Sequence, residues 1–352
     1  MITSSSRNAR ISAASRQKQL QALVDQAVAK TLADFPGDPL PTNDVMLSPR
    51  GWPIPVQQRK KLLAEELAIT LVDLNDPAKP VSASHRGDVQ TYPASVIKVF
   101  YVVAAHQWME EGRMPDTPEM RRAIHDTIVY SYNESTSYLV DWLTGTTSGP
   151  ELPPAELDAW HNKRNAVNRY FSLLGYTNIN VNKKPWGEGP YGRETQAIAT
   201  YSPKRNWLTT EATARIMAEI ATGRAVTPER SKQIMELLKR DFSPATRHDP
   251  ALSEHADQAR EFTARGLPQH ARLWSKAGWM STERHDAAYV ELAGGARFVL
   301  ITFTSNHSNE KEIIPTITRV VAEGMAGMYP GGEAPNSKPQ SPEKIQAPTS
   351  KS

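Results

Sequence analysis

The sequence predicts an α+β domain because strand patterns stand at both ends of its central region and helix patterns fill the interval. Residues 68–74 and 81–85 read as strands near the start, and residues 273–304 contain further strands. If the chain forms one core, both groups of strands must meet in a single sheet covered by the intervening helices. The chain has 352 residues, 39% of them hydrophobic, so it is long enough to bury that core.

Residues 1–61 are predicted to lie outside this domain, as a disordered tail, a short helix and a proline-rich linker. Residues 1–15 are biased toward Ser, Arg and Asn and have little to bury. Leu20, Val24 and Val28 recur at helical spacing, which predicts a short helix that ends before Pro36. No apolar segment follows the basic residues near the N-terminus, so no secretory signal is visible and the compartment is left open.

The predicted domain, residues 62–328, begins with a hairpin and continues with helices. The strand at 68–74 ends at the turn Asn75-Asp76-Pro77, and residues 81–85 can pair with it. Thr117 followed by Pro118 and an acidic residue is a strong helix start. Apolar spacing and helix-end signals predict helices from Ser95 to Gly112, from Thr117 to Tyr130, around 139–143, and over 155–174, 209–221 and 227–238.

Two segments of this region have no helical period. Residues 176–208 are rich in Gly, Pro, Asn and Lys, and structureless loops of that length in compact domains are usually functional. Residues 242–269 form a second polar segment that contains His and Pro.

The end of the domain is predicted to be three strands and a helix. The strands cover 273–279, 287–292 and 298–304, and Gly294-Gly295 makes a tight turn between the last two. Those two strands should therefore be antiparallel neighbours. A helix is expected over 313–325, and residues 329–352, rich in Pro, Ser, Lys and Gln, are expected to be disordered.

The first candidate catalytic residues lie in the predicted helix that begins at Ser95. Apart from Ser95 and Lys98, the run to Ala105 is apolar on every face, which is typical of a helix inside a protein. A spacing of three residues places the serine and the lysine on one side of the helix. A buried lysine shifts its pKa readily and can act as a base, and a base beside a serine activates it as a nucleophile.

The Ser-x-x-Lys pattern alone has little weight, because it occurs four times, at Ser15, Ser95, Ser308 and Ser341. Ser15 and Ser341 lie in the predicted tails, and Ser308 lies in a polar stretch. Only Ser95 opens an apolar helix, so its context favours a functional pair over a structural one.

Two further short patterns follow along the chain. Ser131-Tyr132-Asn133 interrupts a helical segment and offers a hydroxyl and an amide together. Lys276-Ala277-Gly278 lies on a predicted strand, where small residues let a substrate lie along the edge. Taken singly, the first pattern could be a helix cap and the lysine a solvated guard of an edge strand. The order of the three patterns along the chain argues against coincidence.

The three patterns resemble the Ser-x-x-Lys, Ser-Asp-Asn and Lys-Thr-Gly motifs of the serine β-lactamase and penicillin-binding-protein superfamily, nearest the class A β-lactamases. The resemblance covers residues 62–328. It implies an α/β sandwich in which helices face a five-stranded antiparallel sheet, with the active site between the sheet and the helical region.

The resemblance also implies catalytic roles. Ser95 would be the acylated nucleophile, and Lys98 the base that helps to remove its proton. Ser131 would pass a proton to the leaving nitrogen, and Asn133 would contact an amide of the substrate.

Substrate-binding roles are implied for the third pattern. Lys276 would hold the carboxylate of the substrate, and Ala277 and Gly278 would form the binding strand. The oxyanion hole would combine the N–H of Ser95 with an N–H of Trp279 or Met280.

The chain departs from the family pattern at three points. Tyr132 stands where the family has Asp, and Ala277 stands where it has Thr. The string Glu-x-x-Leu-Asn, whose glutamate deacylates class A enzymes, does not occur. Loop 176–208 occupies the corresponding place and offers Glu188 and Glu194. The distance to the following helix favours Glu194 as the catalytic base, although either residue can instead be an exposed loop acid.

Composition excludes several other functions. The net charge of +3 is too small to indicate a nucleic-acid partner, the histidines have no metal-binding spacing, and no apolar run reaches the length of a membrane span. The resemblance implies a hydrolase that acts on a small molecule, either a β-lactam or a related amide or ester such as a peptidoglycan-like peptide, without metal ion or organic cofactor, and we expect it to be a monomer. The alternatives are a D-Ala-D-Ala peptidase or esterase, and a penicillin-recognising sensor domain that is acylated without turnover.

Overall fold

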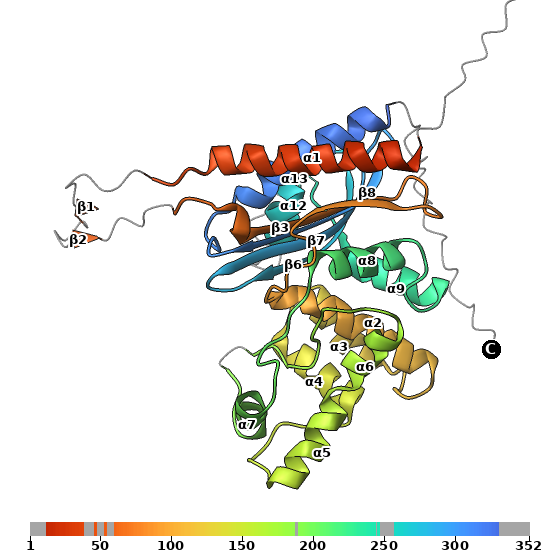
Figure 1. Ribbon diagram of the computed structural model, residues 1–352. Coiled ribbons are helices and arrows are strands. Elements are labelled where there is room, and N and C mark those ends of the chain that lie inside the picture. The colour runs from red at the N-terminus through yellow and green to blue at the C-terminus, as the bar shows by residue number, and fades with distance from the viewer. Residues whose placement is uncertain are drawn as a thin grey trace, which may run out of the picture.

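A central antiparallel sheet separates two layers of helices in the protein (Figure 1). The computed structural model describes residues 12–38, 46–47, 53–54, 60–186, 189–243, 245–246 and 257–330. Strands from both ends of the domain lie in one sheet, with helices from the middle of the chain against it. The predicted α+β class is thereby confirmed.

Within the described residues the sheet contains six strands, in the order β4-β3-β8-β7-β6-β5, and all neighbours are antiparallel. The expectation of five strands was wrong by one, because β5 has two residues and is too short to leave a pattern in the sequence. The other strands lie within one residue of the predicted ones, except that β7 begins four residues earlier than expected, and β7 and β8 are neighbours as expected. The strands are β3 (Leu67–Asp73), β4 (Val81–His85), β5 (Lys239–Arg240), β6 (Arg272–Trp279), β7 (Glu283–Glu291) and β8 (Arg297–Ser305). A separate pair, β1 (Met46–Leu47) and β2 (Pro53–Ile54), falls within the predicted linker.

Both faces of the sheet are buried. On β8, Phe298 and Leu300 pack with helices α1 (Ala13–Asp34) and α13 (Ile313–Met328). Val299 and Ile301 point the other way and pack with α2 (Lys98–Glu110) and α8 (Thr210–Ala221). This double burial explains why β8 reads as a continuous apolar run and not as an alternating one.

Helix α1 is longer than the sequence indicated, and it packs on the sheet. It begins at Ala13, within the segment that was expected to be disordered. Leu20, Val24 and Ala27 are completely buried in the core that α1 shares with α13 and β4. The helix therefore contributes to the core, whereas the limits of the domain at residues 62 and 328 stay a prediction.

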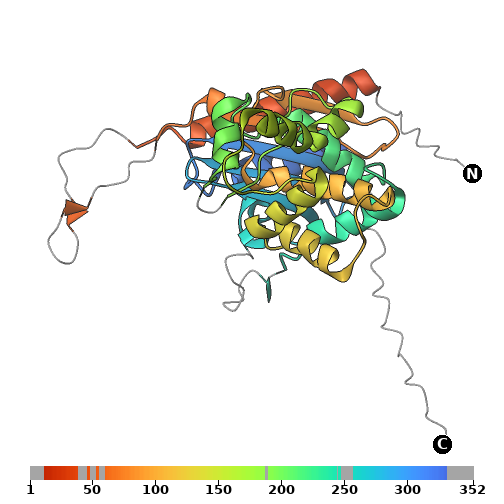
Figure 2. The same ribbon diagram turned by 90° about the horizontal axis from the view of Figure 1, so that it is seen from below.

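The second helical layer, which faces the viewer in Figure 2, differs from the predicted one in two places. The single helix expected over 155–174 is two helices that break at Asn165. The region 176–208, expected to lack a helix, contains α7, whose Gln196 side chain bonds both main-chain groups of Leu152 at 2.9 and 2.8 Å. These bonds fix the helix to the segment before residue 154, and Ala197 packs against Leu157 and Trp160 in a small apolar cluster. The layer also contains η2 (Ala94–Ile97), α3 (Pro118–Ile128), α4 (Asn133–Thr144), α5 (Pro154–Arg164), α6 (Ala166–Leu173), α7 (Arg193–Thr200) and α9 (Pro228–Leu238).

Further short helices lie in the described part of the chain. The 3-10 helix η1 (Ala64–Glu66) leads into β3. Within the polar segment 242–269, α11 (Asp257–Arg260) and α12 (Phe262–Gly266) precede β6, and α12 packs against β7 and α13.

Candidate active site

Ser95 lies in the tight turn that leads into α2. Ala94 has a φ of 44°, a left-handed conformation that residues with a side chain rarely adopt. Gly278 of β6 lies directly against this turn: a Cβ added there would be 2.8 Å from Pro93 O and 3.1 Å from Ser95 N. The close approach requires glycine at this position, so the first and third patterns meet in space.

Lys98 is completely buried at the start of α2. Its Nζ donates to the carbonyl of Ser131, to Ser131 Oγ at 3.2 Å and to Asn133 Oδ1 at 2.8 Å. Within the described residues, no hydrogen bond joins it to the Ser95 hydroxyl. Burial lowers the pKa of Lys98 to about 7, and the negative charge of Glu134 opposes this shift. Near neutral pH a large fraction of the amine is therefore uncharged and able to accept a proton.

The second pattern lies in the bend between α3 and α4. Ser131 has a φ of 60°, and Asn133 is the first residue of α4. The residue in the capping position is Tyr132, which makes no side-chain capping bond. The Ser131 and Asn133 side chains instead meet the Lys98 amine.

Lys276 reaches the same bend from the sheet. It is 1% exposed, and its Nζ donates to Ser131 Oγ at 2.9 Å and to Ala277 O at 2.8 Å. The Ser131 oxygen therefore accepts hydrogen bonds from both lysines. Burial, with the positive charges of Lys98 and Arg240, lowers the pKa of Lys276 well below its ordinary value. A buried lysine of this kind is not a solvated guard of an edge strand.

Two polar residues beside Lys276 were missed by the sequence analysis. Gln258 Oε1 accepts from the N–H of Ala277 at 3.0 Å and from Lys276 Nζ at 3.4 Å. Arg240 Nη2 donates to Ser275 O at 2.7 Å and approaches the same Gln258 oxygen at 3.4 Å. The edge of β6 is thus covered by the polar segment 242–269, in which no sequence pattern distinguished Gln258.

Asp286 of β7 is the buried acid of this region. It pairs with Ala277 in the sheet register and is 1% exposed. Burial raises its pKa, while its hydrogen bonds from Thr263 and the charges of Arg240 and Lys276 oppose that shift. No signal in the sequence marked it, because Asp286 follows three polar residues and lies just before the predicted start of the strand.

The register of β6 distinguishes the two N–H groups, of Trp279 and Met280, that could complete the oxyanion hole. The N–H of Ala277 points away from β7, toward Gln258. The N–H of Trp279 points the same way, because the main-chain N–H groups of a strand point to the same side at every second residue. The N–H of Met280 donates to Glu283 O at 3.0 Å. Trp279 is therefore the remaining candidate to act with the N–H of Ser95.

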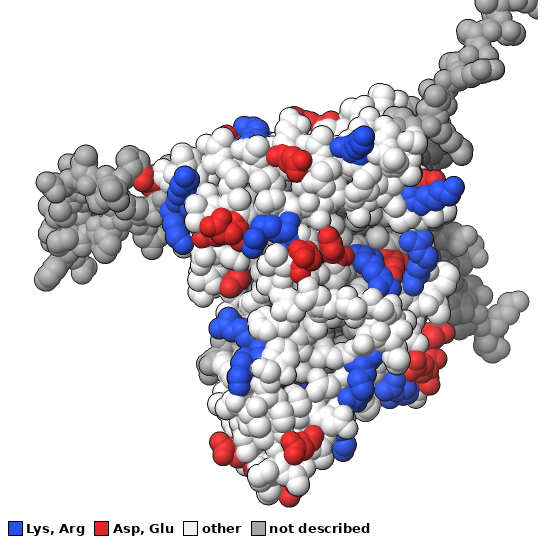
Figure 3. Space-filling model, viewed as in Figure 1, with Lys and Arg blue, Asp and Glu red and all other residues white. Residues whose placement is uncertain are grey.

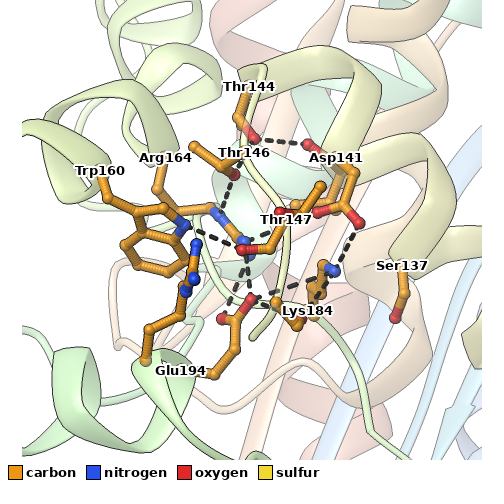
Figure 4. A network of polar contacts seen from close by, with 12 residues as sticks. Ser137, Asp141, Thr144, Thr146, Thr147, Trp160, Arg164, Lys184 and Glu194 are labelled. Atoms are coloured by element: carbon orange, nitrogen blue, oxygen red, sulfur yellow. Dashed lines mark hydrogen bonds and ion pairs between the residues drawn. The ribbon is translucent and has the colours of Figure 1, made fainter. Parts of the chain in front are cut away.

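Glu194 lies at the start of α7 in a buried ion pair (Figure 4). Its Oε1 accepts from Arg164 Nη2 at 2.6 Å and from Ser148 Oγ at 2.9 Å, and its Oε2 accepts from Arg164 Nη1 at 3.3 Å. Within the described residues, no hydrogen bond or ion pair joins Glu194 to Ser95. Its role as a deacylation base stays a prediction, and Glu188 lies outside the described residues.

The same network fastens loop 176–208 to α4. Lys184 Nζ donates to Asp141 Oδ2 at 2.8 Å and to Ser148 Oγ at 3.0 Å, and it lies 4.0 Å from Glu194 Oε1. Asp141 belongs to α4, the helix that begins at Asn133. The loop is therefore anchored to an element of the candidate site, although Glu194 itself is paired elsewhere.

If Ser95 is the nucleophile that the sequence predicts, its rate of acylation is expected to rise with pH through about 7, the pKa of Lys98. The sign follows from the chemistry, since only the neutral amine can take the proton of the serine, and its fraction grows as pH increases. Stopped-flow measurement of acylation by a chromogenic β-lactam across this pH range would test the expectation. A rate that is flat or falls through the same range would contradict it.

The surface carries mixed charge on the face shown in Figure 3, where basic and acidic side chains are interspersed. No helix in the described part of the chain is long and apolar enough to cross a membrane. Among the same residues, no cluster of His, Asp and Glu is suited to hold a metal ion.

Comparison with known proteins agrees with this architecture. Residues 114–325, more than half of the chain, match the model of the beta-lactamase enzyme family. The matched region includes the second and third patterns and begins after Lys98. No curated protein matches the sequence.

Several solved structures share the fold. A beta-lactamase from Sphaerobacter thermophilus is 19% identical, with a TM-score of 0.57 over 88% of this chain and 98% of that one. A point mutant of PBP-A, in an acyl-enzyme complex with penicillin G, is 16% identical, with a TM-score of 0.57 over 88% and 97%. A class A beta-lactamase representative from Bacteroides cellulosilyticus is 14% identical, with a TM-score of 0.57 over 87% and 98%.

Proposed function

This chain belongs to the beta-lactamase enzyme family, and we propose that it is a serine hydrolase that forms an acyl-enzyme on Ser95. Its function is of the serine β-lactamase and penicillin-binding-protein kind. The proposed substrate is a β-lactam or a related amide or ester.

The observation that carries this proposal is the position of the Ser131 hydroxyl between two buried lysines. Its oxygen accepts from Lys98 Nζ at 3.2 Å and from Lys276 Nζ at 2.9 Å, so its own proton is left to donate. Buried amines of lowered pKa beside a hydroxyl are suited to proton transfer.

In the proposed acylation, each proton that one group gives up is taken by another. Neutral Lys98 takes the proton of Ser95 as Oγ attacks the carbonyl carbon, and the N–H groups of Ser95 and Trp279 stabilise the oxyanion. When the C–N bond breaks, Ser131 donates its proton to the leaving nitrogen and recovers one from Lys98. Lys276 is proposed to hold the substrate carboxylate, whose negative charge favours the charged form of this amine. Asn133 Nδ2 contacts the substrate amide beside the strand of Ala277 and Gly278.

Deacylation is proposed to depend on loop 176–208, with Glu194 as the candidate base. In its described position Glu194 would have to give up a hydrogen bond from Arg164 or Ser148 before it could activate a water. That observation favours a second candidate function, a penicillin-recognising protein or peptidase whose β-lactam adduct persists. In either case acylation occurs at Ser95, and the two functions differ in the lifetime of the ester.

Intact-mass spectrometry after incubation with benzylpenicillin is expected to find one covalent adduct, located by digestion on the peptide that contains Ser95. The adduct is expected there because Ser95 lies three residues before the buried amine of Lys98, the proposed base. A time course of its decay separates rapid hydrolysis from a persistent acyl-enzyme. An adduct that remains in the Ser95→Ala variant would contradict the proposed function.

A further inference from the structure

We propose that His285 of β7 is a positioning residue that holds the turn carrying Ser95, an inference that rests on the proposed nucleophile. His285 is completely buried, and its Nε2 lies 2.9 Å from the carbonyl oxygen of Tyr92. Tyr92 is three residues before Ser95 and begins the turn. His285 thus acts on the nucleophile through the main chain of the turn.

The partners of the ring determine its tautomer. The N–H of Thr304 donates to Nδ1 at 3.1 Å, so Nδ1 carries no proton. The Tyr92 carbonyl can only accept, so Nε2 carries the hydrogen. Both nitrogens are satisfied only in the neutral Nε2–H form, which makes the ring a specific link between β8 and the turn.

The turn needs such support because of its backbone conformation. Ala94 has a φ of 44°, and a strained residue of this kind persists only where its surroundings hold it. Upstream, Thr91 and Leu208 exchange two main-chain hydrogen bonds of 2.9 and 3.0 Å. Beneath the turn lies Gly278, whose partner in the sheet register is His285. One register pair of the sheet therefore supplies both the surface on which the turn rests and the hydrogen bond that fixes it.

The surroundings of His285 keep it neutral while the catalytic lysine titrates. Its ring lies 4.5 Å from that of Phe303, and the charged neighbours Arg284 and Asp286 point to the opposite face, where they bond Glu261 and Thr263. Burial lowers the pKa of His285 to about 4, whereas that of Lys98 is about 7. Protonation of Nδ1, which would break the hydrogen bond from the Thr304 N–H and free the ring from β8, therefore occurs in a lower pH range than protonation of Lys98.

Two substitutions of His285 separate its two hydrogen bonds. Glutamine places an amide near the Nε2 position and retains the donor to Tyr92, whereas asparagine retains an acceptor near Nδ1 and falls short of Tyr92. We expect His285→Asn to slow acylation by about tenfold to a hundredfold, since a small displacement of a reacting group has effects of this size. The dissociation constant of the non-covalent complex should stay close to that of the parent. His285→Gln should recover most of the rate.

His106→Asn is the matched control. His106 is also a buried histidine, 5% exposed, but its ring nitrogens have no hydrogen-bond partner among the described residues and it lies away from the turn on α2. We expect this variant to lose stability while the folded protein is acylated at the parental rate. Thermal unfolding of each variant identifies the temperature at which all are folded for the comparison.

The outcomes distinguish this inference from the proposed function. If the parent is acylated at Ser95 and His285→Asn is acylated equally fast, the positioning role is wrong and the proposed function stands. If the parent forms no Ser95 adduct, the proposed function fails and the positioning role with it. Nitrogen-15 NMR of the labelled His285 ring tests its hydrogen bonds to Tyr92 and Thr304 without an activity measurement. An Nδ1–H tautomer, or titration of the ring near the ordinary histidine pKa, would overturn the inference.

Discussion

Replacing Lys98 with methionine is expected to slow acylation of Ser95 by about a hundredfold or more, the usual effect of losing a general base. Methionine has a similar length and is apolar, so it can occupy the buried space that Lys98 fills at 0% exposure. It cannot take the serine proton, and it removes the donor that Ser131 and Asn133 share. Stopped-flow acylation by a chromogenic β-lactam, with circular dichroism to verify folding, measures the effect.

Lys276→Met is the matched control for this experiment. Both lysines are buried and both donate to Ser131 Oγ, but only Lys276 is proposed to hold the substrate carboxylate. Its loss should weaken binding of a β-lactam far more than binding of an ester without a carboxylate, whereas Lys98→Met should slow both substrates alike. Unchanged acylation in folded Lys98→Met would show that Lys98 has only a structural role and that the proposed mechanism is wrong.

The sequence predicts strands well where the buried residues are apolar, and poorly where the buried residues are polar and paired with one another. Strand β8 was placed within one residue at each end, because every position from Phe298 to Thr304 is buried and most are apolar. Strand β7 was predicted to begin at Ala287, four residues late. Its first residues, Glu283 to Asp286, look like a loop in sequence, yet Arg284 and Asp286 are buried and bond Glu261 and the N–H of Thr263.

In the candidate site, features that depend on nearby residues could be predicted, whereas contacts between distant parts of the chain could not. Ser95 and Lys98 could be found because their three-residue spacing and the apolar run after them are local features. The contact between Lys276 and Ser131 joins positions 145 residues apart, so it follows only from the order of the strands. Glu194 was selected by its distance along the chain to α8. Its pairing with Arg164 depends on the packing of α5 against α7, which no periodicity indicated.

Replacing Arg164 with methionine is expected to lower the free energy of unfolding by about 3–5 kcal/mol, the usual cost of leaving one charge of a buried pair without its partner. The Arg164 and Glu194 side chains are 1% and 4% exposed, and their nitrogen and oxygen atoms approach to 2.6 Å. Arg164 also donates to Thr146 Oγ1 at 2.9 Å and lies over the ring of Trp160 at 4.4 Å. Urea denaturation followed by tryptophan fluorescence measures the change.

An exposed pair provides the control for this substitution. Lys30 and Asp34 form an ion pair at 2.9 Å with side chains 55% and 41% exposed, and Lys30→Met should change stability by no more than about 1 kcal/mol. The double variant Arg164→Met, Glu194→Leu removes both buried charges, so it should recover much of the stability lost by the single one. If the double variant is as unstable as Arg164→Met, the loss comes from packing against Trp160 and not from an uncompensated carboxylate. If the single variant loses less than about 1 kcal/mol, the pair does not hold α5 to α7, and the Glu194 carboxylate is freer to act as a base than its hydrogen bonds indicate.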